Sequence, residues 1–179
     1  LVEHYDGSSW TEAGNDLPAA RGQGGSAGTQ TAGIIMGGFP SNQALCYTYN
    51  GSNWTEITEL NTARSAGVSF GNSTDAIYAG GYSSTNKSEA EEWNGSTWSE
   101  GNDLNDSRRQ GSGGGSTTGA GFFAGGVGGS PSANPTQMEV WDGTSFSEAN
   151  EINTGRGYLT GGGEATLGIT FGGGPKSPG

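Results

Sequence analysis

The stretch that decides the fold is Y-D-G-S-S-W at residues 5–10, because it returns three more times along the chain. The related stretches are Y-N-G-S-N-W from Tyr49, W-N-G-S-T-W from Trp93 and W-D-G-T-S-F from Trp141. Their starts at residues 5, 49, 93 and 141 lie 44, 44 and 48 residues apart. A repeat of this period means that the fold is assembled from similar supersecondary units.

Further landmarks follow each copy of the motif in a constant order. A glutamate comes two residues after the last aromatic, at Glu12, Glu56, Glu100 and Glu148. After a Leu or Ile, an arginine follows, at Arg21, Arg64, Arg108 and Arg156. A double glycine then begins 16, 16, 17 and 16 residues later, at Gly37, Gly80, Gly125 and Gly172. The same landmarks in four copies indicate four equivalent units.

The motif itself predicts a β-hairpin. Asp-Gly or Asn-Gly between alternating residues is typical of a two-residue type I′ turn, because both central positions need positive φ. In that register Tyr5 faces Ser8 and Glu3 faces Trp10, which makes Tyr5 and Trp10 diagonal neighbours on one face. We expect the repeated aromatics to pack one sheet against the next, with stacking on a ligand as the alternative. The repeat positions are Trp10, Trp54, Trp98 and Phe146.

A second pair of strands is predicted between each arginine and its double glycine. The apolar stretches at 32–36, 76–79, 120–124 and 167–171 are typical of strands, whereas the stretches after the arginines are mostly Gly, Ser, Ala and Thr. Glycine weakens a strand, so its recurrence indicates close approach of backbones at a crowded central axis. Four short strands per unit, without helical periodicity, predict an all-β fold, a β-propeller with one blade per unit.

These landmarks resemble the kelch repeat, in which an Arg precedes the inner strand and an apolar strand ends in Gly-Gly. The resemblance covers the whole chain and implies one propeller domain at 1–179, with the Trp strand outermost. The expected units are 14–59, 60–103, 104–149, and 150–179 completed by 1–13. The ring of four blades would then close by pairing of the N-terminal and C-terminal strands. The alternative is a longer or oligomeric ring, including a homo-oligomer.

The resemblance to kelch proteins also raises an enzymatic possibility, since galactose oxidase belongs to them. Its copper chemistry uses paired Tyr and His ligands and a Tyr joined to a Cys, whereas this chain has one His and one Cys, His4 and Cys46. A sialidase-like site would need an arginine cluster, but here the arginines occupy equivalent positions. A catalytic residue usually appears once. We therefore expect no catalytic residue, no metal site and no cofactor, and we expect His4 to be a surface residue.

Composition narrows the partners. The chain of 179 residues has 7 basic and 18 acidic residues and a net charge of −11, which disfavours binding to nucleic acid and to acidic membranes. No apolar run reaches the length of a membrane span, and a single cysteine cannot form an internal disulfide.

The repeated Glu and Arg are expected to form partly exposed ion pairs, or the Arg to donate to backbone carbonyls. A ring of arginines that faces an anionic ligand is the alternative.

Function is expected in the loops that differ between units. The segments after the double glycines vary most, at 39–45, 82–90 and 127–137, and they supply the candidate binding residues. These candidates are Phe39, Asn42, Tyr82, Asn86, Lys87 and Asn134.

The small polar style of Y-N-G-S-N-W-T-E and N-T-A-R is also similar to kelch-like repeats of marine bacteriophage virion proteins. The sequence therefore predicts a non-catalytic structural or adhesive module, located in a virion or outside the cell. Its expected partners are other proteins of the assembly, or glycans. The alternative is a carbohydrate-active enzyme domain.

Overall fold

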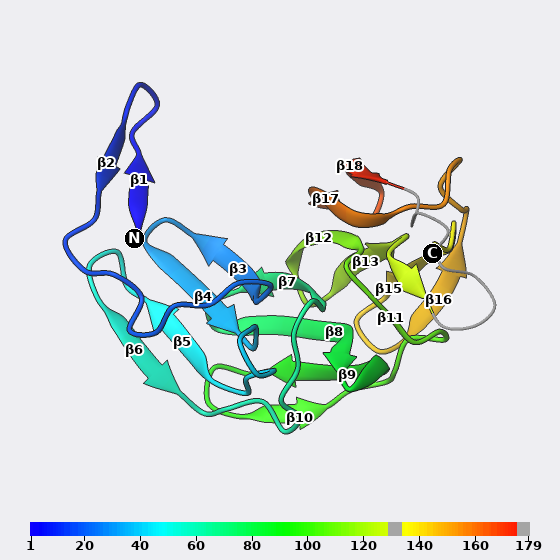
Figure 1. The fold of residues 1–179 in the computed structure, drawn as a ribbon, viewed down its shortest axis with the longest axis horizontal. Coiled ribbons are helices and arrows are strands. Elements are labelled where there is room, and N and C mark those ends of the chain that lie inside the picture. Colours follow the sequence, from blue (N-terminus) through cyan, green and yellow to red (C-terminus); the bar gives the residue numbers. More distant parts are fainter. Residues whose placement is uncertain (129–133, 175–179) are drawn as a thin grey trace.

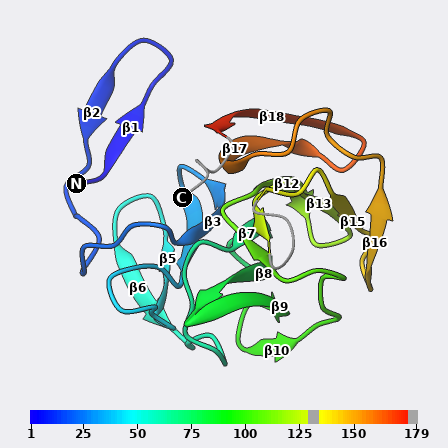
Figure 2. The same ribbon diagram turned by 45° about the vertical axis from the view of Figure 1, so that its right-hand side comes forward.

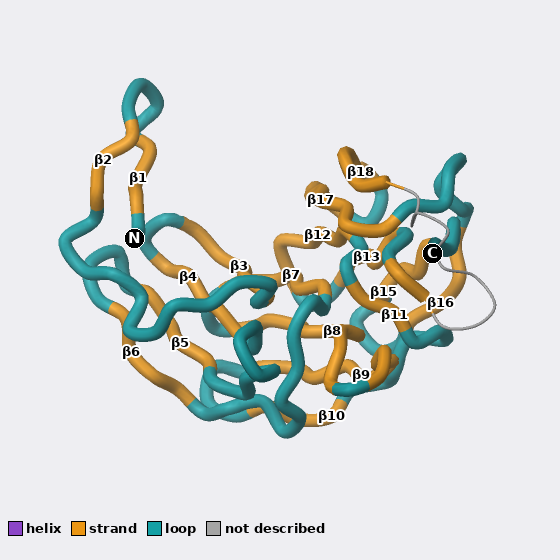
Figure 3. Tube along the Cα trace, in the orientation of Figure 1, coloured by secondary structure: helices purple, strands orange, loops and turns teal. Residues whose placement is uncertain are grey.

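The computed structural model describes residues 1–128 and 134–174, and all regular elements in these ranges are β-strands. The strands and loops form an open arc (Figures 1 and 3). The described part of the chain has no helix that is long and apolar enough to cross a membrane. The expected all-β fold is thus confirmed.

Three antiparallel four-stranded sheets follow one another along the chain. Sheet 1 consists of β3 (Gly25–Thr29), β4 (Ala32–Met36), β5 (Cys46–Tyr49) and β6 (Trp54–Ile57). Sheet 2 consists of β7 (Val68–Asn72), β8 (Asp75–Ser83), β9 (Thr85–Trp93) and β10 (Trp98–Glu100). Sheet 3 consists of β12 (Ser112–Thr117), β13 (Ala120–Ala124), β15 (Met138–Trp141) and β16 (Phe146–Ala149). The prediction of four strands per unit is confirmed for these three units.

The two ends of the chain form separate hairpins, and here the predicted ring closure is wrong. The N-terminal hairpin pairs β1 (Glu3–Tyr5) with β2 (Trp10–Glu12), and the C-terminal hairpin pairs β17 (Gly157–Glu164) with β18 (Leu167–Gly174). Each is a two-stranded sheet of its own, and they stand on opposite sides of the opening of the arc (Figures 1 and 2). The described residues 1–13 and 150–174 therefore do not complete a fourth unit, because β1 and β18 do not meet, and residues 175–179 of the predicted unit lie outside the described ranges.

The first strands of the units, β3, β7, β12 and β17, lie side by side along the inside of the arc. Their glycines allow this approach. A Cβ atom on Gly114 of β12 would lie 2.5 Å from the carbonyl oxygen of Gly163 in β17, and one on Gly25 of β3 would lie 2.8 Å from the ring of Tyr78. The predicted close approach of backbones at the axis is confirmed.

Apolar side chains fill the spaces between neighbouring sheets. Between sheets 1 and 2, Met36 and Cys46 belong to one buried cluster with Tyr78, Trp93 and Trp98.

Between sheets 2 and 3, Phe70 belongs to a second cluster with Phe123, Trp141 and Phe146. The prediction that the aromatics pack one sheet against the next is confirmed here. It is wrong for the N-terminal hairpin, where Tyr5 is 48% and Trp10 66% exposed, since no inner strands of the same unit cover them.

The predicted turn register is wrong by two residues, since Ser8 was the expected partner of Tyr5. Tyr5 lies directly opposite Trp10, and the aromatic pairs of the other units share this geometry with ring centroids 4.8–5.4 Å apart. The reason is the side chain of Asp6, whose Oδ1 accepts the backbone N–H groups of Ser8 and Ser9, each at 2.8 Å. These bonds place Gly7, with φ of 100°, at the first central position of the turn, a conformation that favours glycine.

Two of the repeated arginines are more deeply buried than predicted. Arg64 and Arg108 are fully buried and form ion pairs with Glu91 and Glu139, which lie on the third strands of sheets 2 and 3. These are not the glutamates that follow the motif, so the predicted partly exposed pairing is wrong. The motif glutamates are exposed and lie on the last strand of each hairpin or sheet, at Glu12, Glu56, Glu100 and Glu148.

The other two arginines bond to backbone carbonyls. Arg21 Nη1 donates to the carbonyl oxygens of Gly37 and Leu45, at 3.0 and 2.9 Å, and its guanidinium lies 4.9 Å from the ring centre of Tyr47. Arg156 Nη2 donates to the carbonyl oxygen of Thr170 at 3.4 Å. For these two, donation to carbonyls, the second of the two expected roles, is confirmed.

Candidate functional site

The loops after the double glycines and the segments after the arginines enclose a hollow of about 320 Å³. We call this hollow the loop pocket. It is lined by Gln23, Phe39, Asn42, Ser65, Ala66, Tyr82, Arg109 and Gln110. It therefore draws on all three of the units that form complete sheets.

The same backbone bridge holds the loops in each unit. The residue after the arginine pairs antiparallel with the residue after the double glycine, as Gly22 with Phe39 and Ser65 with Tyr82. In the third unit the bridge lengthens to the short strands β11 (Arg108–Arg109) and β14 (Val127–Gly128). This bridge sets Phe39 and Tyr82 at equivalent places on the rim.

The double glycine is required by the turn that leads to the bridge. Gly80 and Gly81 have φ of 64° and 108°, values that favour glycine. A Cβ atom on Gly80 would also lie 2.5 Å from the carbonyl oxygen of Arg108, and one on Gly81 2.7 Å from that of Ser65. The conformation and the close approach together explain why this pair recurs in the sequence.

Left-handed residues form the floor of the loop pocket. The second residue after each arginine has positive φ although it is not glycine, with values of 56° at Gln23, 60° at Ala66, 55° at Gln110 and 60° at Tyr158. Backbone hydrogen bonds link the first three across the units, from Ala66 N to Gln23 O at 2.7 Å and from Gln110 N to Ala66 O at 2.8 Å. These bonds offset the backbone strain and hold the floor in one conformation.

Tyr82 and Arg109 form the charged side of the loop pocket. The guanidinium carbon of Arg109 lies 4.3 Å from the centre of the Tyr82 ring, a cation–π distance. Arg109 Nη1 donates to Asn86 Oδ1 at 2.9 Å, and Asn86 Nδ2 donates to the carbonyl oxygen of Val127 at 3.2 Å. Asn86 thus orients the guanidinium, and no ion pair in the described part of the chain neutralises Arg109.

The opposite side is made of an aromatic ring and amide groups. Phe39 is 57% exposed. Ser65 Oγ donates to Asn42 Oδ1 at 2.8 Å, which orients the Asn42 amide. Gln110 Oε1 is buried and finds no hydrogen-bond partner within residues 1–128 and 134–174. The loop pocket therefore combines exposed aromatic surface with a cation and the side-chain amides of Asn42 and Gln110.

The structure brings together only part of the predicted binding set. Phe39, Asn42 and Tyr82 line the loop pocket, and Asn86 supports it through Arg109. Lys87 lies outside the lining and forms an ion pair with Glu89 at 3.2 Å.

Asn134 is also outside the lining, in a loop whose residues 129–133 lie outside the described ranges. His4, which was expected at the surface, is partly exposed, and its Nε2 lies 3.0 Å from the Tyr49 hydroxyl.

Sequence reasoning missed Arg109 and Gln110. Arg109 stands where the other units have Gly22, Ser65 and Gly157, so the doubled arginine at 108–109 is a departure from the repeat. This departure from the repeat could have indicated Arg109 as a candidate binding residue. Gln110 gives no such signal, because the position is Gln, Ala or Tyr in the other units.

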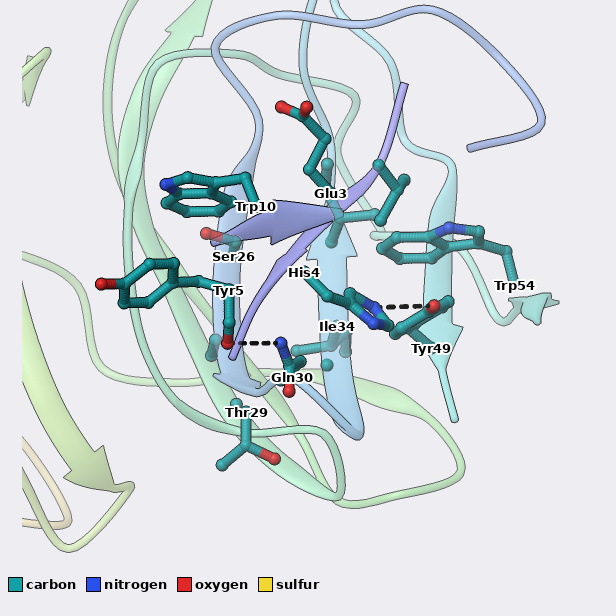
Figure 4. Close-up of a pocket in the computed structure, with 15 residues that line it drawn as sticks. Glu3, His4, Tyr5, Trp10, Ser26, Thr29, Gln30, Ile34, Tyr49 and Trp54 are labelled. Atoms are coloured by element: carbon teal, nitrogen blue, oxygen red, sulfur yellow. Dashed lines mark hydrogen bonds between the residues drawn. The ribbon is translucent and has the colours of Figure 1, made fainter. Parts of the chain in front are cut away.

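A larger hollow of about 650 Å³ lies between the N-terminal hairpin and sheet 1 (Figure 4). Val2 to Tyr5 and Trp10 line one side, and strands β3 and β4 line the other. Gln30 Nε2 donates to the carbonyl oxygen of Tyr5 at 3.1 Å across one end. This hollow borders the unpaired edge of β1 and belongs to the incomplete end of the arc.

Within the described residues, no group of three or more His, Cys, Asp or Glu side chains is placed to hold a metal ion. No protein-family model and no curated protein matches the chain.

Proposed function

We propose that this protein is a kelch-like β-propeller module that binds a glycan in the loop pocket without catalysis. The proposal depends chiefly on one observation, the exposed Phe39 and the Arg109–Tyr82 stack on the rim of one hollow. In keeping with the similarity of its motifs to kelch-like repeats of bacteriophage virion proteins, the module would serve a virion or another extracellular assembly as a structural or adhesive component.

The chemistry of the lining suits a sugar. The faces of aromatic rings carry negative charge density and attract the C–H groups of a sugar ring. Amide groups such as those of Asn42 and Gln110 can both donate to and accept from hydroxyls. A volume of about 320 Å³ lies at the lower end of ligand pockets, which favours recognition of one terminal sugar residue. Arg109 favours a sugar that carries a carboxylate or a sulfate.

The same lining supports a non-catalytic role. Acid–base chemistry on a glycosidic bond uses a pair of carboxyl groups in most families. None of the eight lining residues is Asp, Glu, His or Cys. The loop pocket therefore has groups that bind and orient a sugar and lacks groups that would activate water.

A glycan array tests the proposal. We expect the wild-type protein to bind acidic glycans more strongly than their neutral counterparts, and the variants Tyr82→Ala and Arg109→Ala to lose that binding by about 10-fold or more, as expected for loss of a charge-assisted contact. Lys87→Ala is the matched control, since Lys87 belongs to the same loop but not to the lining. Circular dichroism of each variant checks that the fold is retained.

Two results would overturn the proposal. Equal array signals for the wild type, Tyr82→Ala and Arg109→Ala would remove the loop pocket as the binding site. Turnover above the blank on a panel of glycosides would instead support the carbohydrate-active enzyme.

A further inference from the structure

The two terminal hairpins are complementary halves of one four-stranded sheet. In sheets 1 to 3, the aromatic that opens the motif ends the third strand and faces the aromatic that begins the fourth. Tyr5 of β1 and Trp10 of β2 show the same pairing. The double glycine directly follows the second strand in sheets 1 and 3 and lies within the second strand β8 in sheet 2, and Gly172 and Gly173 mark the same place in β18. The N-terminal hairpin thus has the two outer strands of a unit, and the C-terminal hairpin has the two inner strands.

Exposed apolar surface gathers on these two hairpins. The large apolar side chains that are exposed there are Leu1, Tyr5, Trp10, Tyr158, Leu167, Ile169 and Phe171. Outside the hairpins, Phe39 is the other large apolar residue in the described part that is exposed to this degree. Such surface, next to a free strand edge, is typical of a place where another strand adds.

The ion pairs of sheets 2 and 3 show what the joined sheet would contain. Glu91 in the third strand accepts from Arg64 Nη1 at 2.5 Å and from the backbone N–H of Asn61 at 2.6 Å. In sheet 3, Glu139 accepts from Arg108 Nη2 at 2.6 Å and from the backbone N–H of Asn105 at 2.8 Å. In both, the asparagine lies three residues before the arginine.

Sheet 1 departs from this arrangement in both partners at once. Tyr47 occupies the place of the glutamate, two residues before the motif aromatic at Tyr49. Pro18 occupies the place of the asparagine, three residues before Arg21, and proline has no N–H group to donate. In sheet 1 the backbone N–H donor and the carboxylate that would accept from it are therefore both absent. In a unit that has Asn three residues before the arginine, we accordingly expect a Glu on the third strand.

The C-terminal hairpin has the donors without the carboxylate. Asn153 lies three residues before Arg156, as in sheets 2 and 3. Within the described residues, Arg156 forms no ion pair and Thr170 Oγ1 is buried without a hydrogen-bond partner. Glu3 is the residue two positions before Tyr5, it is exposed, and it likewise forms no ion pair.

We propose that β1 of one copy of this chain pairs antiparallel with β18 of a second copy. By the register of sheets 1 to 3, Tyr5 would face Gly168 and Glu3 would face Thr170. The Glu3 carboxylate then meets Arg156 and the N–H of Asn153 of the other copy. The inner strands of that copy fill the hollow of about 650 Å³ beside β1 (Figure 4).

A second copy is the occupant because each hairpin is anchored at its own end of the arc (Figure 1). The His4–Tyr49 contact and the bond from Asn15 Nδ2 to Asn53 Oδ1, at 3.0 Å, hold the N-terminal segment on sheet 1. The strand β17 packs on β12 of sheet 3. A second copy offers the missing half without bending the arc, and the resulting head-to-tail contact closes a ring of two or more copies.

Sedimentation or light scattering of charge-reversal variants tests the proposal. The wild type is expected at a multiple of 18.1 kDa. Glu3→Arg and Arg156→Glu should each weaken association about 100-fold or more, because each leaves like charges facing one another at the contact. An equimolar mixture of the two variants should assemble again, since every contact between unlike copies then joins opposite charges. Glu59→Arg, at an exposed position outside both hairpins, is the matched control and should assemble normally.

Closure of one chain on itself gives a different pattern. The wild type would then be a monomer, and mixing the two variants would restore nothing, which overturns pairing between copies. Assembly unaffected by any of the reversals also overturns it.

Cysteine cross-linking tests the same pairing independently, in case the charge-reversal variants do not fold. Chains with Val2→Cys, mixed with chains with Phe171→Cys, should form a covalent dimer on oxidation, since the register places these residues opposite one another. The native Cys46 is buried and contributes little background. Absence of the cross-linked dimer in a mixture that is folded by circular dichroism would contradict the pairing.

Discussion

Arg108 and Glu139 form a fully buried ion pair, with 2.6 Å between Nη2 and Oε1 and side chains that are 0% and 1% exposed. Burial lowers the pKa of Arg108, although the nearby Glu139 acts in the opposite direction. The Glu139 carboxylate also accepts from the backbone N–H of Asn105. The other terminal nitrogen of the guanidinium, Arg108 Nη1, donates to the carbonyl oxygen of Gln137 at 2.7 Å. The pair thus ties the segment before sheet 3 to the third strand of that sheet.

Removal of one partner from this pair should be costly. Glu139→Gln leaves the Arg108 guanidinium buried without a counter-charge, and such a change lowers the free energy of unfolding by about 3–5 kcal/mol. Glu148→Gln is the control, because Glu148 lies directly opposite Glu139 but is exposed. Urea denaturation measures both. A loss below about 1 kcal/mol for Glu139→Gln, as for surface pairs, would show that the pair is hydrated.

The two tryptophans of the motif should differ in their contribution to stability. Trp98 is 6% exposed and its indole N–H donates to the carbonyl oxygen of Thr58 at 3.1 Å, so Trp98→Ala should lower the free energy of unfolding by about 3–5 kcal/mol. Trp54 is half-buried and its indole nitrogen has no hydrogen-bond partner among the described residues. Trp54→Ala should therefore cost less. Equal losses in guanidinium denaturation would contradict this order.

The single cysteine should be unreactive in the folded protein. Burial raises the pKa of the Cys46 thiol to about 11, so at pH 8 the nucleophilic thiolate is scarce as well as inaccessible. We expect a disulfide reagent to modify Cys46 at least about 100-fold more slowly in the native protein than in denaturant. The control is Cys46→Ser with Ser52→Cys, which presents a thiol at an exposed turn position. Fast modification of native Cys46 would show that sheets 1 and 2 separate readily.

The same group gives a pH dependence with a definite sign. A thiol whose pKa is raised on folding contributes stability below the pKa of the unfolded chain, and this contribution is lost as the pH rises toward about 11.

The aspartate of the last hairpin should titrate below its ordinary range. Oδ1 of Asp142 accepts the backbone N–H groups of Ser145 and Thr144, each at 2.9 Å, and these bonds lower the pKa of the carboxyl. The amide signal of Ser145 in an NMR titration should therefore move with a midpoint below about 3.9. Asp142→Asn should give a flat curve with the turn intact, because Asn94 holds the same place in sheet 2. A midpoint at or above the ordinary value would contradict the bonding.

Much of the fold could be predicted because it is encoded by local repeats. The strands at 32–36 and 120–124 coincide with β4 and β13, since short apolar runs bounded by Gly have few other solutions. The turn register could not be predicted from Asp-Gly alone. Asp-Gly suits a type I′ turn in which both residues are central, and it equally suits a turn in which the Asp carboxylate accepts the following N–H groups and moves Gly7 to the first central place.

For the candidate site, the sequence identified the variable loops and thus Phe39, Asn42 and Tyr82, because departures from a repeat are visible along the chain. It did not identify Arg109 as their neighbour, since Tyr82 and Arg109 meet only when sheets 2 and 3 pack side by side.

By itself, the sequence determined the strands, the meander of each unit and the glycines at the axis, all of which depend on contacts within one repeat. Only the tertiary structure decided which glutamate neutralises each arginine and which side chains share the loop pocket. It also decided that the terminal hairpins stay apart. The physical reason is that these features depend on how neighbouring units are placed in space, and a repeated sequence pattern carries little information about the geometry between units.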